Sequence, residues 1–293
     1  MSIGVIIGVH DGIVLGADSA SSLIVSAAPG VAAGVANVYD NANKIFNLYK
    51  GMPIGCVTFG AGSIGKSSIG TLIKDLRRSL ADPNLAKDFG FDPENYTMEG
   101  VANIVSKFIS DECQKAENAP NLPQMDLGLL IGGYSTGKSL GESWSVTIKG
   151  GKATNVKMLR KPDEPGISWG GQTEVLQRIV LGHSPALYDA LASVMAPPAG
   201  AQAPTAAQLA NDLGPLLRAR LQAQVVFAHM PIQDAIDVGR FLVDSAIMFS
   251  RFLPGAQTVG GPIELAAITK HEGFKWVARK HYYERDLNPG DEL

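Results

Sequence analysis

The chain has 293 residues and a formal net charge of −3, with 45% hydrophobic and 18% charged residues. These values exclude a disordered chain and are sufficient for a large core. The near-neutral balance disfavours nucleic-acid binding, which usually needs a basic domain. The two cysteines, Cys56 and Cys113, are too few for a disulfide framework or a zinc ribbon, so we expect a reducing compartment, the cytoplasm.

Membrane and export signals are also not expected. Residues 1–12 lack the basic region that opens a signal peptide, and their apolar run soon meets His10 and Asp11. No stretch approaches the roughly 18 uninterrupted apolar residues of a membrane span. The five histidines are scattered without metal-ligand spacing, so we expect no metal site.

The first part of the chain predicts two β-hairpins followed by two helices. The dipeptide Asp11-Gly12 between two apolar runs indicates a tight hairpin turn. The segment from Leu23 to Val38 is rich in alanine, glycine and valine without a period, and is interpreted as a loop or irregular insert. The expected strands are residues 3–9, 12–17, 44–48 and 54–59, and the expected helices are residues 67–80 and 98–116.

The rest of the chain repeats this alternation. We expect strands at residues 127–131, 144–148, 153–156, 263–269 and 274–278, and helices at residues 173–181, 205–226 and 232–250. Antiparallel hairpins that alternate with helices predict an α+β fold, a four-layer αββα sandwich with two sheets inside. We expect one domain over residues 1–293, with an extra helical insertion near 190–229 and a polar C-terminal tail near 281–293.

One candidate site is a phosphate loop. Residues Gly60–Ser67 read GAGSIGKS, which fits G-x-x-x-x-G-K-S between a predicted strand and a predicted helix. In such a loop Lys66 binds phosphates and Ser67 holds magnesium. No later strand ends in an aspartate suited to hold the metal, and the element order is not a series of βαβ units. A P-loop nucleotide hydrolase is therefore the less favoured hypothesis.

The second candidate site is an N-terminal nucleophile. Ser2 follows Met1, and a small second residue permits removal of the methionine. The exposed α-amine, with a pKa near ~7.7–8.0, could then act as the base for the hydroxyl of the same residue. Ser2 by itself says little, because many proteins begin in this way. The hairpin at Asp11-Gly12, however, brings Asp18 back beside the start of the first strand, and Lys44 could pair with Asp18.

Residues 2–80 resemble the proteasome β-subunits, the peptidase subunit of bacterial ATP-dependent proteases and the ancestral-β-subunit homologues. These are N-terminal-nucleophile (Ntn) hydrolases. The resemblance rests on Ser2 followed by IGVIIGVHDGIVLGADS, on NANKIFNL and on TFGAGSIGKSS. It implies that Ser2 is the nucleophile, that Asp18 and Lys44 assist it, and that the N–H of Gly62 stabilises the oxyanion.

The likeness extends over about four-fifths of the chain, through LGLLIGGYSTG, SWGGQTEVLQRIV, the last long helix and TVGGPIELAAITKHEG. The sequence departs from the family at three points. Serine replaces the usual threonine nucleophile. Trp169 aligns with an accessory serine, with Ser168 one residue earlier as the candidate. The segment FLPGAQTVGG lacks the family's aspartate and offers only Thr258 as a hydroxyl.

The resemblance also implies a substrate pocket and an assembly. The pocket would be lined by Ala42, Phe46, Gly60 and Ile64, and as these carry no charge we expect a preference for an apolar or small group beside the scissile amide. The implied function is hydrolysis of peptide or other amide bonds without a cofactor. The implied partners are a peptide or protein substrate, further copies of the chain in a ring or helical stack, and an unfoldase. The alternative is a proteasome-like oligomeric scaffold that has lost catalysis.

Overall fold

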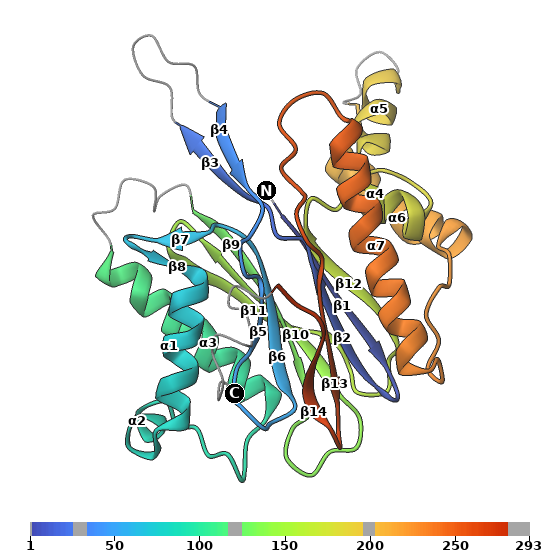
Figure 1. Cartoon of the computed structure of the whole chain (residues 1–293). Coiled ribbons are helices and arrows are strands. Elements are labelled where there is room, and N and C mark those ends of the chain that lie inside the picture. Colours follow the sequence, from blue (N-terminus) through green and yellow to red (C-terminus); the bar gives the residue numbers. More distant parts are fainter. Residues whose placement is uncertain (1, 26–33, 117–124, 196–202, 281–293) are drawn as a thin grey trace.

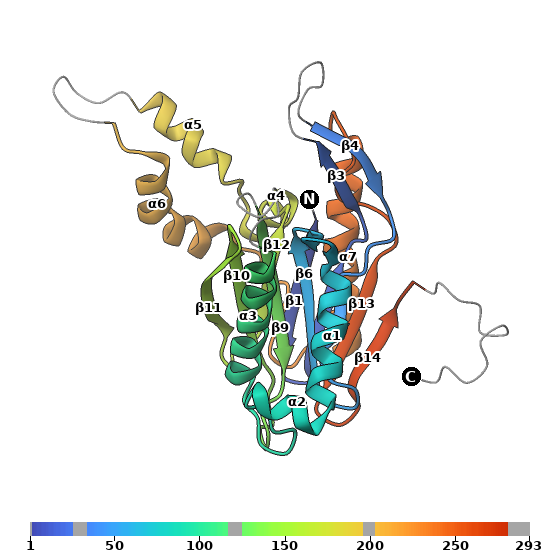
Figure 2. The ribbon, with the colours of Figure 1, turned by 90° about the vertical axis from the view of Figure 1, so that its left-hand side faces the viewer.

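The computed structural model describes residues 2–25, 34–116, 125–195 and 203–280. Two five-stranded antiparallel sheets lie face to face, and helices cover the outer face of each sheet (Figures 1 and 2). This arrangement confirms the predicted α+β sandwich with four layers. In this part of the chain, no helix is long and apolar enough to cross a membrane.

The first sheet carries the start of the chain. Its strands, in spatial order, are β12 (Gly166–Gly171), β1 (Ile3–Val9), β2 (Gly12–Ala17), β13 (Glu264–Thr269) and β14 (Gly273–Ala278). The second sheet has the order β11 (Lys152–Arg160), β10 (Glu142–Lys149), β9 (Asp126–Gly133), β6 (Ile54–Gly60) and β5 (Ile45–Asn47). The predicted turn at Asp11-Gly12 is confirmed, since β1 and β2 pair with Val9 opposite Gly12.

The helices form the two outer layers and a projecting arm. The second sheet is covered by α1 (Ile69–Ala81) and α3 (Met98–Lys115), which α2 (Pro83–Asp88) joins at one end. The first sheet is covered by α7 (Ile232–Phe252), with the short α4 (Glu174–Leu176) and a π-helical turn (Gln177–Leu181) beside it. The arm consists of α5 (Ala186–Val194) and α6 (Ala206–Leu221), which contact each other and extend away from the sheets (Figure 2).

Strand β1 is buried on both faces, because its alternate side chains pack in two different apolar clusters. In β1, Ile3, Val5 and Ile7 pack in the cluster that includes α7, whereas Ile6 packs between the sheets. Successive residues of a strand point to opposite faces, so both faces of this strand must be apolar. The same reasoning places the side chain of Ser2, which lies in the even-numbered set with Ile6, toward the space between the sheets.

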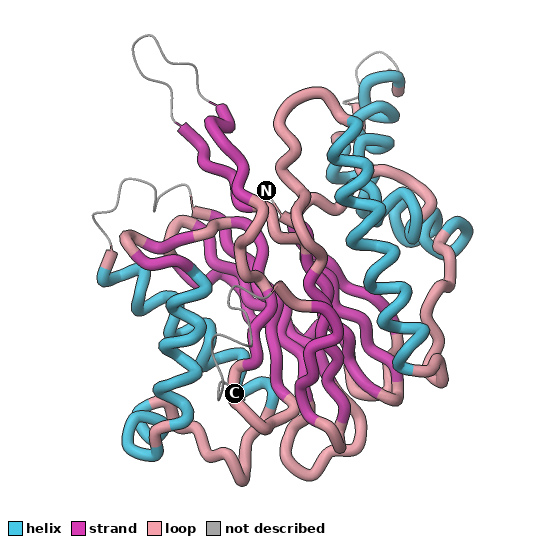
Figure 3. The backbone as a smooth tube through the Cα atoms, in the orientation of Figure 1, coloured by secondary structure: helices cyan, strands magenta, loops and turns pink. Residues whose placement is uncertain are grey.

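Two predictions about the first half of the chain were wrong. The segment expected to be a loop contains β3 (Ser21–Val25) and β4 (Gly34–Tyr39), which pair as a hairpin that projects beyond both sheets (Figure 3). This hairpin lacks the usual apolar alternation because no core covers it, and Leu23 and Ile24 are 49% and 67% exposed. Helix α2 was also missed, although Asp82 caps it and Pro83 begins it, a recognisable start signal.

The predicted insertion near residues 190–229 contains the end of α5 and all of α6. Helix α6 ends at Leu221, so it is shorter than the helix predicted over residues 205–226. The predicted C-terminal tail at residues 281–293 lies outside the described residues. The division into one domain with these two additions stays a prediction.

Candidate active site

Ser2 lies where β1 begins, close to the N-terminal end marked in Figure 1. The residue is only 5% exposed. Its carbonyl oxygen accepts a hydrogen bond of 2.7 Å from the N–H of Gln172. Gly171, just before Gln172, has a φ of +95°, and a Cβ there would stand 1.9 Å from the Ser2 carbonyl oxygen. Only glycine allows this approach, which fixes the backbone of Ser2 against the end of β12.

Asp18 lies directly after β2 and is fully buried. Its Oδ1 accepts hydrogen bonds from the N–H of Ile3, at 3.0 Å, and from Nζ of Lys44, at 2.5 Å. Its Oδ2 accepts from the N–H of Ala20, at 3.1 Å, and of Gly260, at 3.0 Å. Each carboxylate oxygen therefore has two donors, a set that satisfies an ionised side chain and connects the starts of several segments.

Lys44 supplies the positive charge of this ion pair and is 5% exposed. Its carbonyl oxygen accepts from the N–H of Thr58 at 2.8 Å, so the residue is held beside β6. Burial lowers the pKa of the Lys44 ammonium from its usual range, and the carboxylate of Asp18 opposes that change. The structure thus pairs Asp18 with Lys44 beside the start of β1. The sequence predicted this pairing, and the catalytic roles of both residues stay predictions.

A cleft of about 310 Å³ contains the groups expected to act together. It is lined by Ser2, Lys44 and Gly62, and by residues from β3, β6 and the start of α1. The loop between α7 and β13 does not line this cleft but supplies the N–H of Gly260, which donates to Asp18. The predicted nucleophile Ser2, the ammonium of Lys44 and the predicted oxyanion donor Gly62 therefore share one cleft.

The turn that carries Gly62 depends on close backbone packing. Gly60 has a φ of +94°, and a Cβ at this residue would stand 2.3 Å from the carbonyl oxygen of Asp126. The carbonyl of Gly62 accepts from the N–H of Ile69 at 3.0 Å, which anchors the turn to the first residue of α1. Ser68 caps this helix through Thr71.

The same segment does not adopt the conformation of a phosphate loop. Two short strands, β7 (Ser63–Ile64) and β8 (Ser67–Ser68), pair with each other, and Lys66 is exposed in the turn between them. A phosphate loop needs the lysine at the point where the helix begins, whereas α1 begins only at Ile69. The neighbours of β6 are antiparallel, which also differs from a βαβ unit. The geometry argues against the P-loop hypothesis.

The predicted substrate pocket is divided by the structure. Ala42 and Gly60 line the cleft, but Phe46 and Ile64 are buried in the core beneath α1. The expectation of a charge-free pocket was wrong, because Lys74 of α1 also lines the cleft. Lys74 lies one helical turn after Gly70, which also lines the cleft. Residues four apart in a helix share a face, so the predicted helix over residues 67–80 was the available signal for Lys74.

Ser168 lies away from Ser2. In the pairing of β1 with β12 it stands opposite Ile6, while Ile3 stands opposite Gly171. At about 3.3 Å per residue, four residues along β1 correspond to roughly 13 Å. The residues of β12 at the Ser2 end are Gly171 and Gln172. The proposed accessory role of Ser168 therefore gains no support from its position.

Sequence reasoning missed the role of Phe59, which also lines the cleft. Its ring occupies space between the sheets that three glycines leave open. A Cβ on Gly128 or Gly170 would come within 2.2 Å or 2.1 Å of this ring, and one on Gly4 within 3.4 Å. Gly4 and Gly128, each within a predicted strand, were the available sequence signal, because a strand glycine often marks a close approach.

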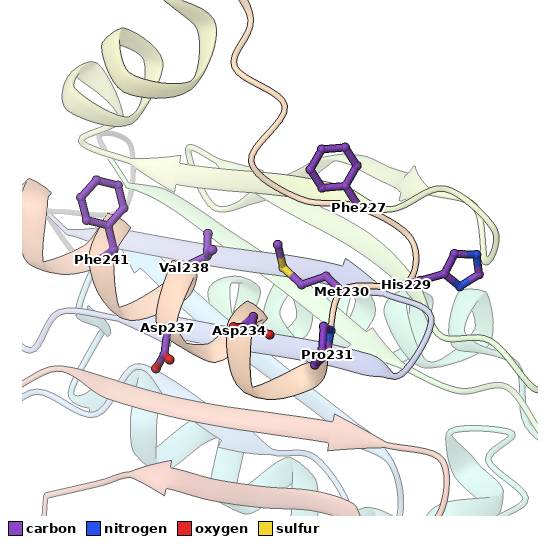
Figure 4. A pocket seen from close by; sticks show the side chains of 8 residues that line it. All are labelled: Phe227, His229, Met230, Pro231, Asp234, Asp237, Val238 and Phe241. Atoms are coloured by element: carbon purple, nitrogen blue, oxygen red, sulfur yellow. The ribbon is translucent and has the colours of Figure 1, made fainter.

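A second hollow of about 620 Å³ lies on the outer face of α7 (Figure 4). Phe227, Met230, Val238 and Phe241 give it an apolar lining. It lies at the far end of β1 from Ser2, since the ring of neighbouring His229 packs against His10 in the β1–β2 turn. Among the residues described, we find no group of three or more side chains suited to hold a metal ion.

Two antiparallel sheets between helical layers, with the first strand opening on Ser2, define the fold of Ntn hydrolases of the proteasome β-subunit type. Solved structures of Anbu, the ancestral β-subunit, share this fold over nearly the whole chain. An Anbu mutant from Hyphomicrobium sp. strain MC1 is 13% identical, with a TM-score of 0.56, over 98% of this chain and 91% of that chain.

Two further Anbu structures give similar values. For Anbu from Yersinia bercovieri the identity is 13% and the TM-score 0.50, over 96% of this chain and 88% of that chain. The helical assembly of the Anbu complex from Pseudomonas aeruginosa is 15% identical with a TM-score of 0.50, over 97% and 90%. No family model matches the sequence. No curated protein matches it either. The comparisons confirm the predicted resemblance at the level of the fold.

Proposed function

We propose that this protein hydrolyses peptide or other amide bonds, with Ser2 as the nucleophile after Met1 has been removed. The observation that carries the proposal is the buried Lys44–Asp18 ion pair in the cleft that Ser2 lines. A buried ion pair costs desolvation energy and is weak evidence for stability. The Lys44–Asp18 pair lies beside Ile3, the first residue of β1, and next to the cleft. A role in catalysis at Ser2 explains why the pair lies there.

The reaction follows from the groups present. The free α-amine of Ser2 accepts the proton of its own hydroxyl, directly or through a water, and the oxygen attacks the amide carbonyl. The positive charge of Lys44, which Asp18 holds in place, lowers the pKa of the hydroxyl. The N–H of Gly62 stabilises the oxyanion. The amine then gives its proton to the leaving nitrogen, and water releases the acyl group by the reverse sequence.

We further propose that the protein acts as a homo-oligomer. The Anbu complex from Pseudomonas aeruginosa forms a helical assembly. Here, large apolar side chains stand exposed along α7, with Phe241 at 55% and Phe252 at 74%. An unfoldase partner and a cytoplasmic location stay predictions, the latter supported by the free thiols of Cys56 and Cys113.

The test begins with the intact mass of the untagged protein, which reports whether Met1 has been removed. A peptide epoxyketone is then added, because it reacts with both groups of an N-terminal serine. The hydroxyl adds to the ketone carbonyl, and the amine opens the epoxide, so the adduct retains every atom of the probe. We expect one adduct per chain, located at Ser2 by fragmentation, together with cleavage of fluorogenic peptides.

The variant Ser2→Ala should lose peptide cleavage by about a thousandfold or more, as removal of other nucleophiles does. Ser145→Ala, which removes a hydroxyl on β10, should retain it. Full activity of Ser2→Ala would refute the proposal. Retained Met1, no adduct and an intact oligomer would together support the alternative of a non-catalytic scaffold.

A further inference from the structure

A second buried ion pair lies behind the first. Nζ of Lys280 stands 3.1 Å from Oε1 of Glu264, and the two side chains are only 6% and 1% exposed. Nζ of Lys280 also donates to Oγ of Ser19, at 2.5 Å, and to the carbonyl of Ala42, at 2.8 Å. An ammonium has three donors, so all three are used by partners in three different segments.

These contacts join the second pair to the cleft. Oε2 of Glu264 accepts from the N–H of Lys44, at 3.2 Å. The N–H of Ala42 donates to the carbonyl of Ser19, at 2.9 Å. Ala42 is thus held on both sides, by Ser19 through its N–H and by Lys280 through its carbonyl. Lys44, two residues later, is held through its own N–H by the carboxylate that Lys280 neutralises.

We propose that Lys280 is a positioning residue for the Ser2 site, which holds residues 42–44 against β13 so that the Lys44 side chain reaches Asp18. This inference rests on the proposed function, because it concerns the same cleft. The contacts of the Lys280 ammonium are with Glu264, Ser19 and Ala42, and Lys280 is not among the residues that line the cleft. It acts through the backbone of Ala42, which lines the cleft, and through Glu264.

The charges of the cluster support this assignment. Asp18, Lys44, Glu264 and Lys280 alternate in sign and sum to zero. The positive charge of Lys280 lowers the pKa of Lys44, whereas Glu264 and Asp18 raise it. Without Lys280, the buried carboxylate of Glu264 would face Lys44 alone, and the pKa of Lys44 would rise.

The first experiment does not depend on catalysis. Amide hydrogen exchange over residues 41–47 is compared in the wild type, in Lys280→Met and in Lys275→Met, a control at an exposed residue of β14, the strand that precedes Lys280. Loss of a hydrogen bond from a charged group to a backbone carbonyl should speed exchange about tenfold or more in Lys280→Met only. Unchanged exchange would overturn the inference, even in an active enzyme.

The second experiment measures activity. Lys280→Met should raise KM and lower kcat, about tenfold in their ratio. The basic limb of its pH profile should move to higher pH, because the pKa of Lys44 rises. In Lys280→Met/Glu264→Gln the limb should return, while the faster exchange stays. This neutral pair also replaces the single variant if that variant does not fold.

The outcomes separate the two proposals. An inactive wild type with unreactive Ser2 refutes the proposed function, whereas the exchange data still decide the role of Lys280. Kinetics of Lys280→Met equal to those of Lys275→Met, in an active enzyme, would refute the positioning role.

Discussion

Replacement of Asp18 by asparagine tests the physical basis of the site. Both oxygens of the Asp18 carboxylate accept two hydrogen bonds, so the NH₂ group of asparagine must face two donors whichever way the amide is turned. The substitution also leaves the buried Lys44 without its counter-ion. Breaking a buried pair in this way costs about 3–5 kcal/mol. At ~2–4 °C per kcal/mol, the midpoint of thermal unfolding should fall by roughly 10 °C.

The assay is urea unfolding at neutral pH, followed by fluorescence, for Asp18→Asn, Lys44→Met and the double variant. The double variant should be more stable than the sum of the single effects predicts, with a coupling of about 2 kcal/mol, because it leaves no buried charge unpaired. Lys107→Met is the control, since it removes an exposed ion pair with Asp111, and should cost under about 1 kcal/mol. An Asp18→Asn variant within about 1 kcal/mol of the wild type would refute this reasoning.

Two further predictions concern substrate choice and assembly. Lys74→Glu reverses a charge at the edge of the cleft. Cleavage beside basic groups should therefore gain roughly fivefold over cleavage beside acidic groups, as ~1 kcal/mol of Coulomb energy implies. The same ratio of basic to acidic cleavage in variant and wild type would show that Lys74 does not face the substrate. Phe252→Asp should reduce the oligomer seen by sedimentation, whereas Leu85→Asp, equally apolar but on α2, should not. An unchanged oligomer in Phe252→Asp would remove this end of α7 from the interface.

The sequence was sufficient for elements whose own periodicity matches their burial. Helix α1 has Ile69, Leu72, Ile73, Leu76 and Leu80 on one buried face, and this face was visible from spacing alone. Strand β12 was not predicted, because three of its six residues are glycines, which make room for Arg160, Phe59 and the Ser2 carbonyl instead of supplying an apolar pattern. Local patterns in the sequence reveal which side chains are buried. A glycine in the sequence does not reveal which side chain fills the space beside it.

For the site, distance along the chain set the limit. Asp18 and Lys44 were predicted because a hairpin and a family resemblance place them. The contacts of Lys280 with Ser19 and Ala42 span 261 and 238 residues of the sequence, and no short motif encodes them. Ser168 was chosen by alignment near Trp169, and the strand register then placed it too far along β12. One residue of register error moves a side chain to the other face, and several move it out of reach.

The surroundings of Ser2 are completed in an order set by protein synthesis. The ribosome delivers Ser2, Asp18 and Lys44 early, but Gly260, Glu264 and Lys280 leave it only when most of the chain has been made. Until then Asp18 lacks one of its donors, and the backbone of Lys44 lacks its acceptor. A nascent chain therefore carries Ser2 without the contacts that complete its surroundings. For the hydrolase proposed above, this order keeps the site incomplete until synthesis of the chain is nearly finished.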